Sequence, residues 1–172
     1  MRNRFGDNER SLRDQIFEVL GKSKTSPQED LAALFQCATH IRNRLLIETT
    51  ARECGLKLSR FQMNDALELY YDLKQGRDDV GFISKGWDDP GFRVGSVVEV
   101  PKWKLDAVKD HTYGLLKYCA TRGIVLTVET KDDVIEYQMG SVIYSDGFNT
   151  EVFVQVLRSL NECTDKANEL LS

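Results

Sequence analysis

The spacing of hydrophobic positions predicts helices through the first 78 residues of the chain. Residues 11–20 carry four aliphatic side chains at helical spacing. A longer helix is predicted from Pro27 to Gly55, because Ser26 can cap it, proline suits the first helical position, and apolar residues then recur every three or four positions. A third helix is predicted over 59–75 from the stripe Phe61, Ala66, Leu67, Tyr70 and Leu73. The second and third helices would form a helical hairpin.

Beyond Gly76 the pattern changes to short β-branched runs separated by turn residues. It predicts strands at 80–84, 92–100, 124–129 and 134–138, with a helix at 105–119. Gly140 is predicted to interrupt the sheet before a further short strand, and Asn149 to cap a closing helix. The prediction is an α+β protein with an N-terminal helical hairpin segment, then a small antiparallel sheet flanked by helices. We divide it into a helical subdomain, 1–78, and an α+β subdomain, 79–172.

Charge follows the same division and argues against binding to nucleic acid. The chain has 172 residues with 23 Lys and Arg against 27 Asp and Glu, a formal net charge of −4. Residues 1–78 are nearly neutral, with 13 basic and 12 acidic side chains, whereas residues 79–172 hold 10 and 15. No net positive field would attract phosphate. Because the sequence contains neither a signal peptide nor a long apolar run, we expect a cytoplasmic protein with no membrane contact.

The sequence contains no recognisable catalytic or metal-binding motif. His40 and Cys37 share a helix face, but zinc sites need at least three protein ligands. A nucleophile elbow, a P-loop and a dinucleotide fingerprint are all missing. The adjacent aspartate pairs at 78–79, 88–89 and 132–133 suit solvated turns. We therefore expect no catalytic residue, no metal and no cofactor, and we expect reduced, buried thiols at Cys37, Cys54, Cys119 and Cys163.

Exposed aromatic residues and a free sheet edge are the remaining functional candidates. Aromatic side chains near turns and strand ends are typical anchors of protein interfaces. An unpaired edge strand can accept a partner strand or a second copy of the chain. The residues that we predict to bind a partner are Phe92, Trp103, Tyr137 and Tyr144.

The second half of the chain also resembles a known family. Val-Val-Glu-Val-Pro (97–101) precedes the predicted helix, and Gly-Ile-Val-Leu-Thr-Val-Glu (123–129), Val-Ile-Glu-Tyr (134–137), Gly-Ser-Val-Ile-Tyr (140–144) and Phe-Asn-Thr-Glu-Val-Phe (148–153) follow it. Residues 97–172 resemble the YbjN-like bacterial proteins, which are similar in fold to type III secretion chaperones. The resemblance implies a dimeric bacterial protein without catalytic residues that holds a polypeptide segment or a regulatory partner. The long helical front has no counterpart in the short chaperones.

Together these features predict a non-enzymatic protein-interaction module, chaperone-like or adaptor-like, and a homodimer. One alternative is an enzyme without a local motif, whose pocket would collect at least two of Asp88, Asp89, His111 and Glu136. Another is a nucleic-acid-associated regulator using the basic cluster between Arg42 and Arg60. In that reading the helices around Gly55 would resemble a helix-turn-helix, although the third helix carries acidic residues that suit phosphate poorly.

Overall fold

The structure, a computed structural model, describes residues 27–63, 69–86 and 89–171. The chain divides into two compact units, residues 1–45 and 46–172. Helix α2 (Pro27–Glu53) begins and ends as its sequence predicts. Gly55 follows it with a left-handed φ of 69°, and Leu56 N–H donates to the Ala51 carbonyl across it at 2.8 Å. The helix predicted at 11–20 lies outside the described residues.

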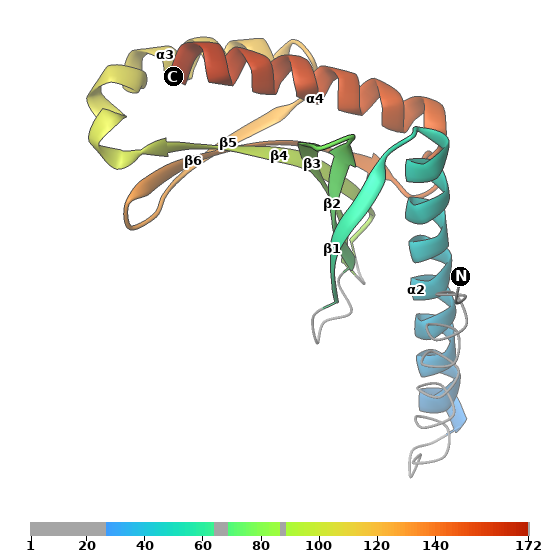
Figure 1. Cartoon of the computed structure of the whole chain (residues 1–172). Helices are drawn as coiled ribbons and strands as arrows, with labels where there is room; N and C mark the ends of the chain where they lie inside the picture. Colours follow the sequence, from blue (N-terminus) through green and yellow to red (C-terminus); the bar gives the residue numbers. More distant parts are fainter. Residues whose placement is uncertain (1–26, 64–68, 87–88, 172) are drawn as a thin grey trace. The chain divides into compact units, whose positions relative to one another are not determined.

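Six antiparallel strands form one sheet in the second unit, in the order β1-β2-β3-β4-β6-β5 (Figure 1). The strands are β1 (Lys57–Met63), β2 (Leu69–Gln75), β3 (Asp78–Lys85), β4 (Gly91–Pro101), β5 (Val125–Thr130) and β6 (Val134–Tyr144). A 3₁₀ turn η1 (Lys102–Lys104) leads into α3 (Leu105–Ala120), and α4 (Thr150–Leu171) closes the chain. The α+β class is therefore confirmed.

The predicted third helix is wrong, because residues 59–63 belong to strand β1 and residues 69–75 form strand β2. In β2, Leu69, Tyr71 and Leu73 are buried at alternate positions, which is the period of a strand with one face on a core. The short apolar run fits a helical stripe as well, and pairing with β3 along its whole length decides the outcome. The residues that the structure describes thus contain no helical hairpin, and strands β1 and β2 lie within the range 1–78 predicted to be helical.

The predicted strands and helices after residue 79 are confirmed, with one exception at Gly140. Strand β6 runs without interruption through this glycine, which pairs with Gly95 of β4 on one side and Val125 of β5 on the other. The predicted break is wrong because both neighbours hold the backbone in the ladder. The Asn149 cap is confirmed, since its Oδ1 accepts the Val152 N–H at 3.0 Å.

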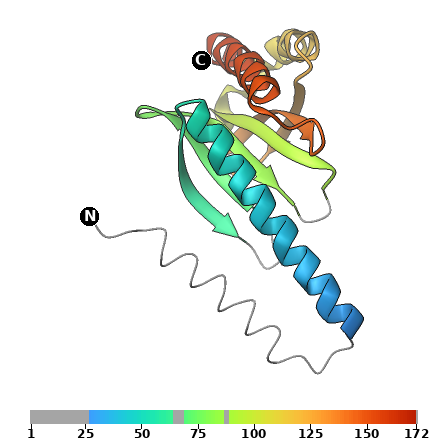
Figure 2. The same cartoon turned by 90° about the vertical axis from the view of Figure 1, so that its right-hand side faces the viewer.

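The hydrophobic core lies between the sheet and helices α3 and α4, which cover one of its faces (Figures 1 and 2). The last turns of α2 within the second unit add Ile47 and Ala51 to the buried residues. Tyr71 Oη donates to Glu48 Oε1 at 3.3 Å and links these turns to β2. The opposite face of β4, β6 and β5 is not covered by any described element of residues 46–171.

Candidate functional site

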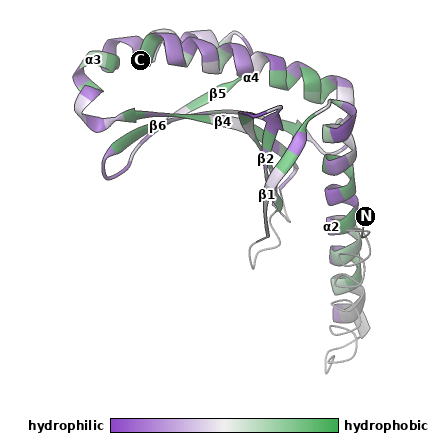
Figure 3. Ribbon diagram, in the orientation of Figure 1, coloured by the Kyte–Doolittle hydropathy of each residue, from purple (hydrophilic) through white to green (hydrophobic). Residues whose placement is uncertain are grey.

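Strand β5 is an outer strand of the sheet and carries little of the usual edge protection. It pairs with β6 alone, so its other edge leaves backbone groups unpaired within the described sheet. Its sequence, Val-Leu-Thr-Val-Glu-Thr, contains no proline and no lysine. Val125 and Val128 are 66% and 46% exposed, and Figure 3 colours much of β5 as hydrophobic. An exposed β-branched edge of this kind is suited to strand addition.

One side of α3 extends this apolar surface. Val108, Leu115 and Cys119 face the core, whereas Leu105, Tyr113 and Leu116 are exposed. At 3.6 residues per turn, the three exposed side chains fall within about one quarter of the helix circumference. The contact between Tyr118 and Arg122, and the ion pair from Arg122 to Glu162 of α4, mark the opposite side. The exposed side of α3 therefore faces away from α4, toward the edge made by β5.

We call this region the β5–α3 surface and define it by its four exposed apolar side chains on the helix-covered side of the sheet. They are Leu105, Tyr113, Leu116 and Val128. Sequence reasoning missed them as a surface, because it counted Leu105 and Leu116 among the apolar residues of the predicted helix and Val128 as part of the predicted strand. The sequence signal that could have revealed them is two apolar residues in a row, such as Leu115 and Leu116. Two consecutive side chains do not both fit on one buried face, so one of them is expected to be exposed.

The structure separates the four residues predicted to bind a partner. Phe92 is fully buried, with its ring centroid 4.1 Å from that of Phe148. Tyr137 is buried too, and its hydroxyl shares a 3.0 Å hydrogen bond with Thr112 Oγ1. Both are core residues and are not available at this surface.

The other two predicted anchors are exposed at opposite ends of the sheet. Trp103 is 80% exposed on η1, beside the turn between β5 and β6, where Lys102 N–H donates to the Asp133 carbonyl at 2.9 Å. Tyr144 is 63% exposed at the far end of β6, opposite Gly91. They do not belong to one patch, and Trp103 is the one next to the β5–α3 surface.

A row of three carboxylates crosses the uncovered face of the sheet. Glu136 of β6 lies directly opposite Glu99 of β4 on one side and Glu129 of β5 on the other. Lys131 Nζ lies 2.7 Å from Glu136 Oε1, and Gln138 donates to Glu136 Oε2 at 3.0 Å. The hydrogen bond from Lys131, followed by that from Gln138, lowers the pKa of Glu136. We call Glu99, Glu129 and Glu136 the glutamate row.

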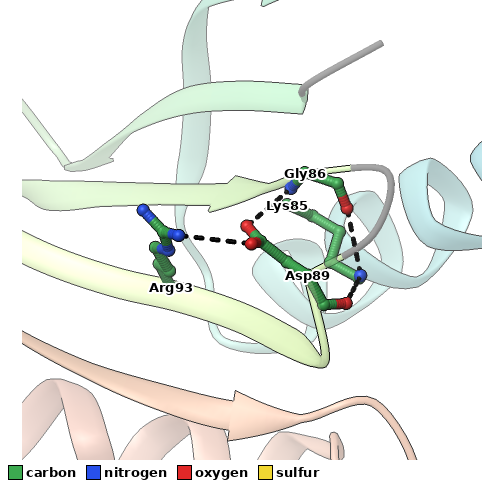
Figure 4. A network of polar contacts seen from close by, with 4 residues as sticks. All are labelled: Lys85, Gly86, Asp89 and Arg93. Atoms are coloured by element: carbon green, nitrogen blue, oxygen red, sulfur yellow. Dashed lines mark hydrogen bonds and ion pairs between the residues drawn. The ribbon is translucent and has the colours of Figure 1, made fainter. Parts of the chain in front are cut away.

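The residues that would build an enzyme pocket are not brought together. Asp88 lies outside the described residues. Asp89 stabilises the turn between β3 and β4 instead: its carboxylate accepts the Gly86 N–H at 3.1 Å and Arg93 Nη2 at 3.2 Å (Figure 4). Buried Lys85 donates to the Gly86 and Asp89 carbonyls in the same turn.

His111 and Glu136, the other two residues predicted for an enzyme pocket, lie on different sides of the sheet. His111 is exposed on α3, which packs on the covered face, and Glu136 lies on the uncovered face.

A groove of about 330 Å³ lies between α4 and the strands near the end of α2. It is lined by Cys54, Leu56, Gln75, Val80, Val154, Leu157, Arg158, Asn161, Glu162 and Asp165. Asp89, His111 and Glu136, the described residues among those predicted for an enzyme pocket, are not part of this lining. Within the described part of the chain, no group of three or more histidine, cysteine or acidic side chains is arranged to hold a metal ion.

The four cysteines are free thiols, and two of them lie deep in the core. Cys119 of α3 and Cys163 of α4 are both fully buried. Burial raises the pKa of both, that of Cys163 to about 12, helped by its neighbour Cys119. The thiolate that would react or bind metal is therefore strongly disfavoured at neutral pH.

The basic cluster on α2 and β1 does not form a helix-turn-helix. Arg42, Arg44 and Arg52 lie on α2, and Lys57 begins β1. The side chain of Arg60 is not among those that the structure describes. Because residues 57–63 and 69–75 form strands, the described residues directly after Gly55 do not supply the second helix that would enter a DNA groove.

These features define an α+β fold in which a helix pair covers one face of a six-stranded antiparallel sheet, with a hydrophobic outer edge. The chain is similar in fold to the crystal structure of an uncharacterized protein from Methanothermobacter thermautotrophicus, with a TM-score of 0.57 over 75% of this chain and 99% of that one, at 10% identity. It is also similar to the crystal structure of YbjN from E. coli, with a TM-score of 0.47, 13% identity, and coverage of 73% and 92%.

The predicted YbjN-like resemblance is thus confirmed as a likeness of fold, and the match to YbjN, below a TM-score of 0.5, carries no argument about activity. No protein-family model matches the sequence, and no curated protein matches it. None of the described helices combines the length and the apolar character needed to span a bilayer.

Proposed function

We propose that the chain is a non-enzymatic protein-interaction module that binds a polypeptide segment by strand addition at β5. The observation that supports this most directly is the coincidence of an unprotected edge strand with exposed apolar side chains on the helix beside it. A strand added beside β5 would complete main-chain hydrogen bonds. Its alternate side chains would cover Leu116 and Val128, and the amphipathic ring of Trp103 lies nearby as an anchor.

A second copy of the chain is the occupant when no other partner is bound. Two β5 strands can pair antiparallel about a twofold axis, because the same surface then meets itself. The exposed valines of β5 and the leucines of α3 become buried in such a dimer. The module therefore works as a homodimer or by exchanging its second copy for a partner segment, in the manner of an adaptor or a chaperone.

The experiment compares the full chain with variants that place charge on this surface. Val128→Lys together with Leu116→Lys adds two ammonium groups where an apolar contact is expected. Gln155→Lys together with Asn168→Lys, on exposed positions of α4, is the matched control. Light scattering and pull-down with each immobilised chain give the two readouts.

We expect the wild type to form a dimer or to retain a defined protein partner. Both properties should be lost in the β5–α3 double variant and kept in the α4 control. A wild-type chain that is monomeric and retains nothing contradicts the proposal. So does association that the β5–α3 substitutions leave unchanged.

A further inference from the structure

The uncovered face of the sheet combines the glutamate row with an apolar area that the fold does not use. Outward positions of an antiparallel sheet that faces water are ordinarily polar. Here Val97, Val125 and Val142 point outward and are 43%, 66% and 46% exposed. They surround the directly paired glycines Gly95 and Gly140. We call these three residues the valine patch.

The paired glycines leave part of this face without a side chain of its own. The Phe82 ring lies over Gly95, where its Cζ would be 2.7 Å from an added Cβ. At Gly140, only the backbone atoms Val94 O and Gly95 Cα lie within 4 Å of an added Cβ, and no side chain of the described residues does. An apolar group from another molecule can therefore contact the sheet directly between Phe82 and Val125.

Charge lies at a defined distance from the valine patch. The glutamate row is four residues along the strands from the glycine pair, which is about 13 Å, and the row itself spans about 10 Å across three strands. It holds three carboxylates against the single ammonium of Lys131. Like charges directly opposite one another on a sheet are destabilising, so a cationic partner would relieve an existing repulsion.

We infer that this face binds a basic amphipathic segment of another polypeptide, with lysine or arginine side chains over the glutamate row and apolar side chains over the valine patch. Nucleic acid and anionic lipid surfaces are disfavoured because the row would repel phosphate. The inference rests on the proposed function as a polypeptide-binding module. It assigns the module a second surface and names the chemistry of its partner.

The test measures binding of three labelled synthetic peptides to the full chain by fluorescence anisotropy. The first peptide contains lysine and leucine in an amphipathic pattern. The second has glutamate in place of lysine, and the third has serine in place of leucine. We expect the first peptide to bind and the other two to bind at least about tenfold more weakly. The second lacks the positive charges that face the glutamate row, and the third lacks the apolar side chains that face the valine patch.

Variants assign that binding to this face. Glu99→Lys with Glu129→Lys should weaken the first peptide about tenfold, and Val125→Ser with Val142→Ser should also weaken it. The matched control, Asp110→Lys with Asp146→Lys, changes the net charge equally at exposed positions elsewhere and should change affinity less than about twofold.

Three results overturn the inference. The first is equal weakening by the glutamate and control variants, which would mean a general effect of net charge. The second is no binding of the first peptide, and the third is binding that only the β5–α3 double variant removes. In each case the proposed strand addition at β5 is still decided by its own association experiment.

Discussion

The two faces of strands β4, β6 and β5 are built from the same backbone and perform different tasks. On the covered face Val94, Ile135 and Met139 are buried beneath α3 and α4. On the uncovered face, at alternate positions of the same strands, Val97, Val142, Glu99 and Glu129 are exposed, while Glu136 is buried. The comparison teaches that apolar character alone does not mark the core of this protein. The buried apolar side chains of these strands lie on the face that α3 and α4 cover, and that face forms the core.

The largest difference between the faces should appear when one apolar side chain is removed from each. Phe92→Ala on the covered face is expected to lower the free energy of unfolding by about 3–5 kcal/mol, because a fully buried ring is lost. Val142→Ala on the uncovered face should cost less than about 1 kcal/mol, since its side chain is 46% exposed. Urea denaturation measures both. Similar losses would show that the uncovered face is packed as well.

A smaller difference is expected for tyrosine hydroxyls on the same strand. Tyr137→Phe removes the buried hydrogen bond to Thr112 and should cost about 1 kcal/mol. Tyr144→Phe, at the exposed end of β6, is the matched control and should leave stability unchanged within about 0.5 kcal/mol. Thermal and urea unfolding of the two variants provide the comparison, and an equal cost would contradict the assignment of Tyr137 to the core.

The smallest effect concerns pH and lies on the uncovered face. The folded state lowers the pKa of Glu136 below 4.5, chiefly through its hydrogen bond with Lys131. The ionised carboxylate therefore favours folding above the usual pKa, and this contribution is lost as the pH falls through the lower folded-state value. Wild type should exceed Glu136→Gln in stability at neutral pH, and the gap should close below about pH 4.

Lys131→Met should remove the same gap, because it takes away the first cause of the shift. Denaturant midpoints of the four combinations of these two substitutions, measured across acidic pH, give the result. A gap that persists in acid would mean that the side chain of Glu136 contributes packing rather than charge.

The sequence carried enough information for the elements that local signals define. Pro27 and Gly55 bound α2, and Asn149 caps α4, because each acts through the backbone of its own turn. The hairpin of β5 and β6 was likewise predictable from its β-branched runs. Residues 59–75 were not, since Leu69, Tyr71 and Leu73 become a strand face only through pairing with β3, which is a tertiary effect.

The candidate surfaces were harder to predict than the fold. Aromatic residues near turns looked like anchors, yet Phe92 and Tyr137 proved to be core residues because helices pack onto their strand face. Which face receives the helices, and which strand lies at the edge, depend on the strand order. That order places β6 between β4 and β5 and so leaves β5 outermost, a fact that no local pattern contains.

Hydrogen exchange at strand β5 tests the proposed strand addition most directly. Amides of Val125–Thr130 on the free edge should exchange rapidly in dilute wild-type protein and gain protection at high concentration or with a bound partner segment. The Val128→Lys and Leu116→Lys double variant should show no such gain, while amides of β4 stay protected throughout. Association of the wild-type chain without any added protection in β5 would contradict the account.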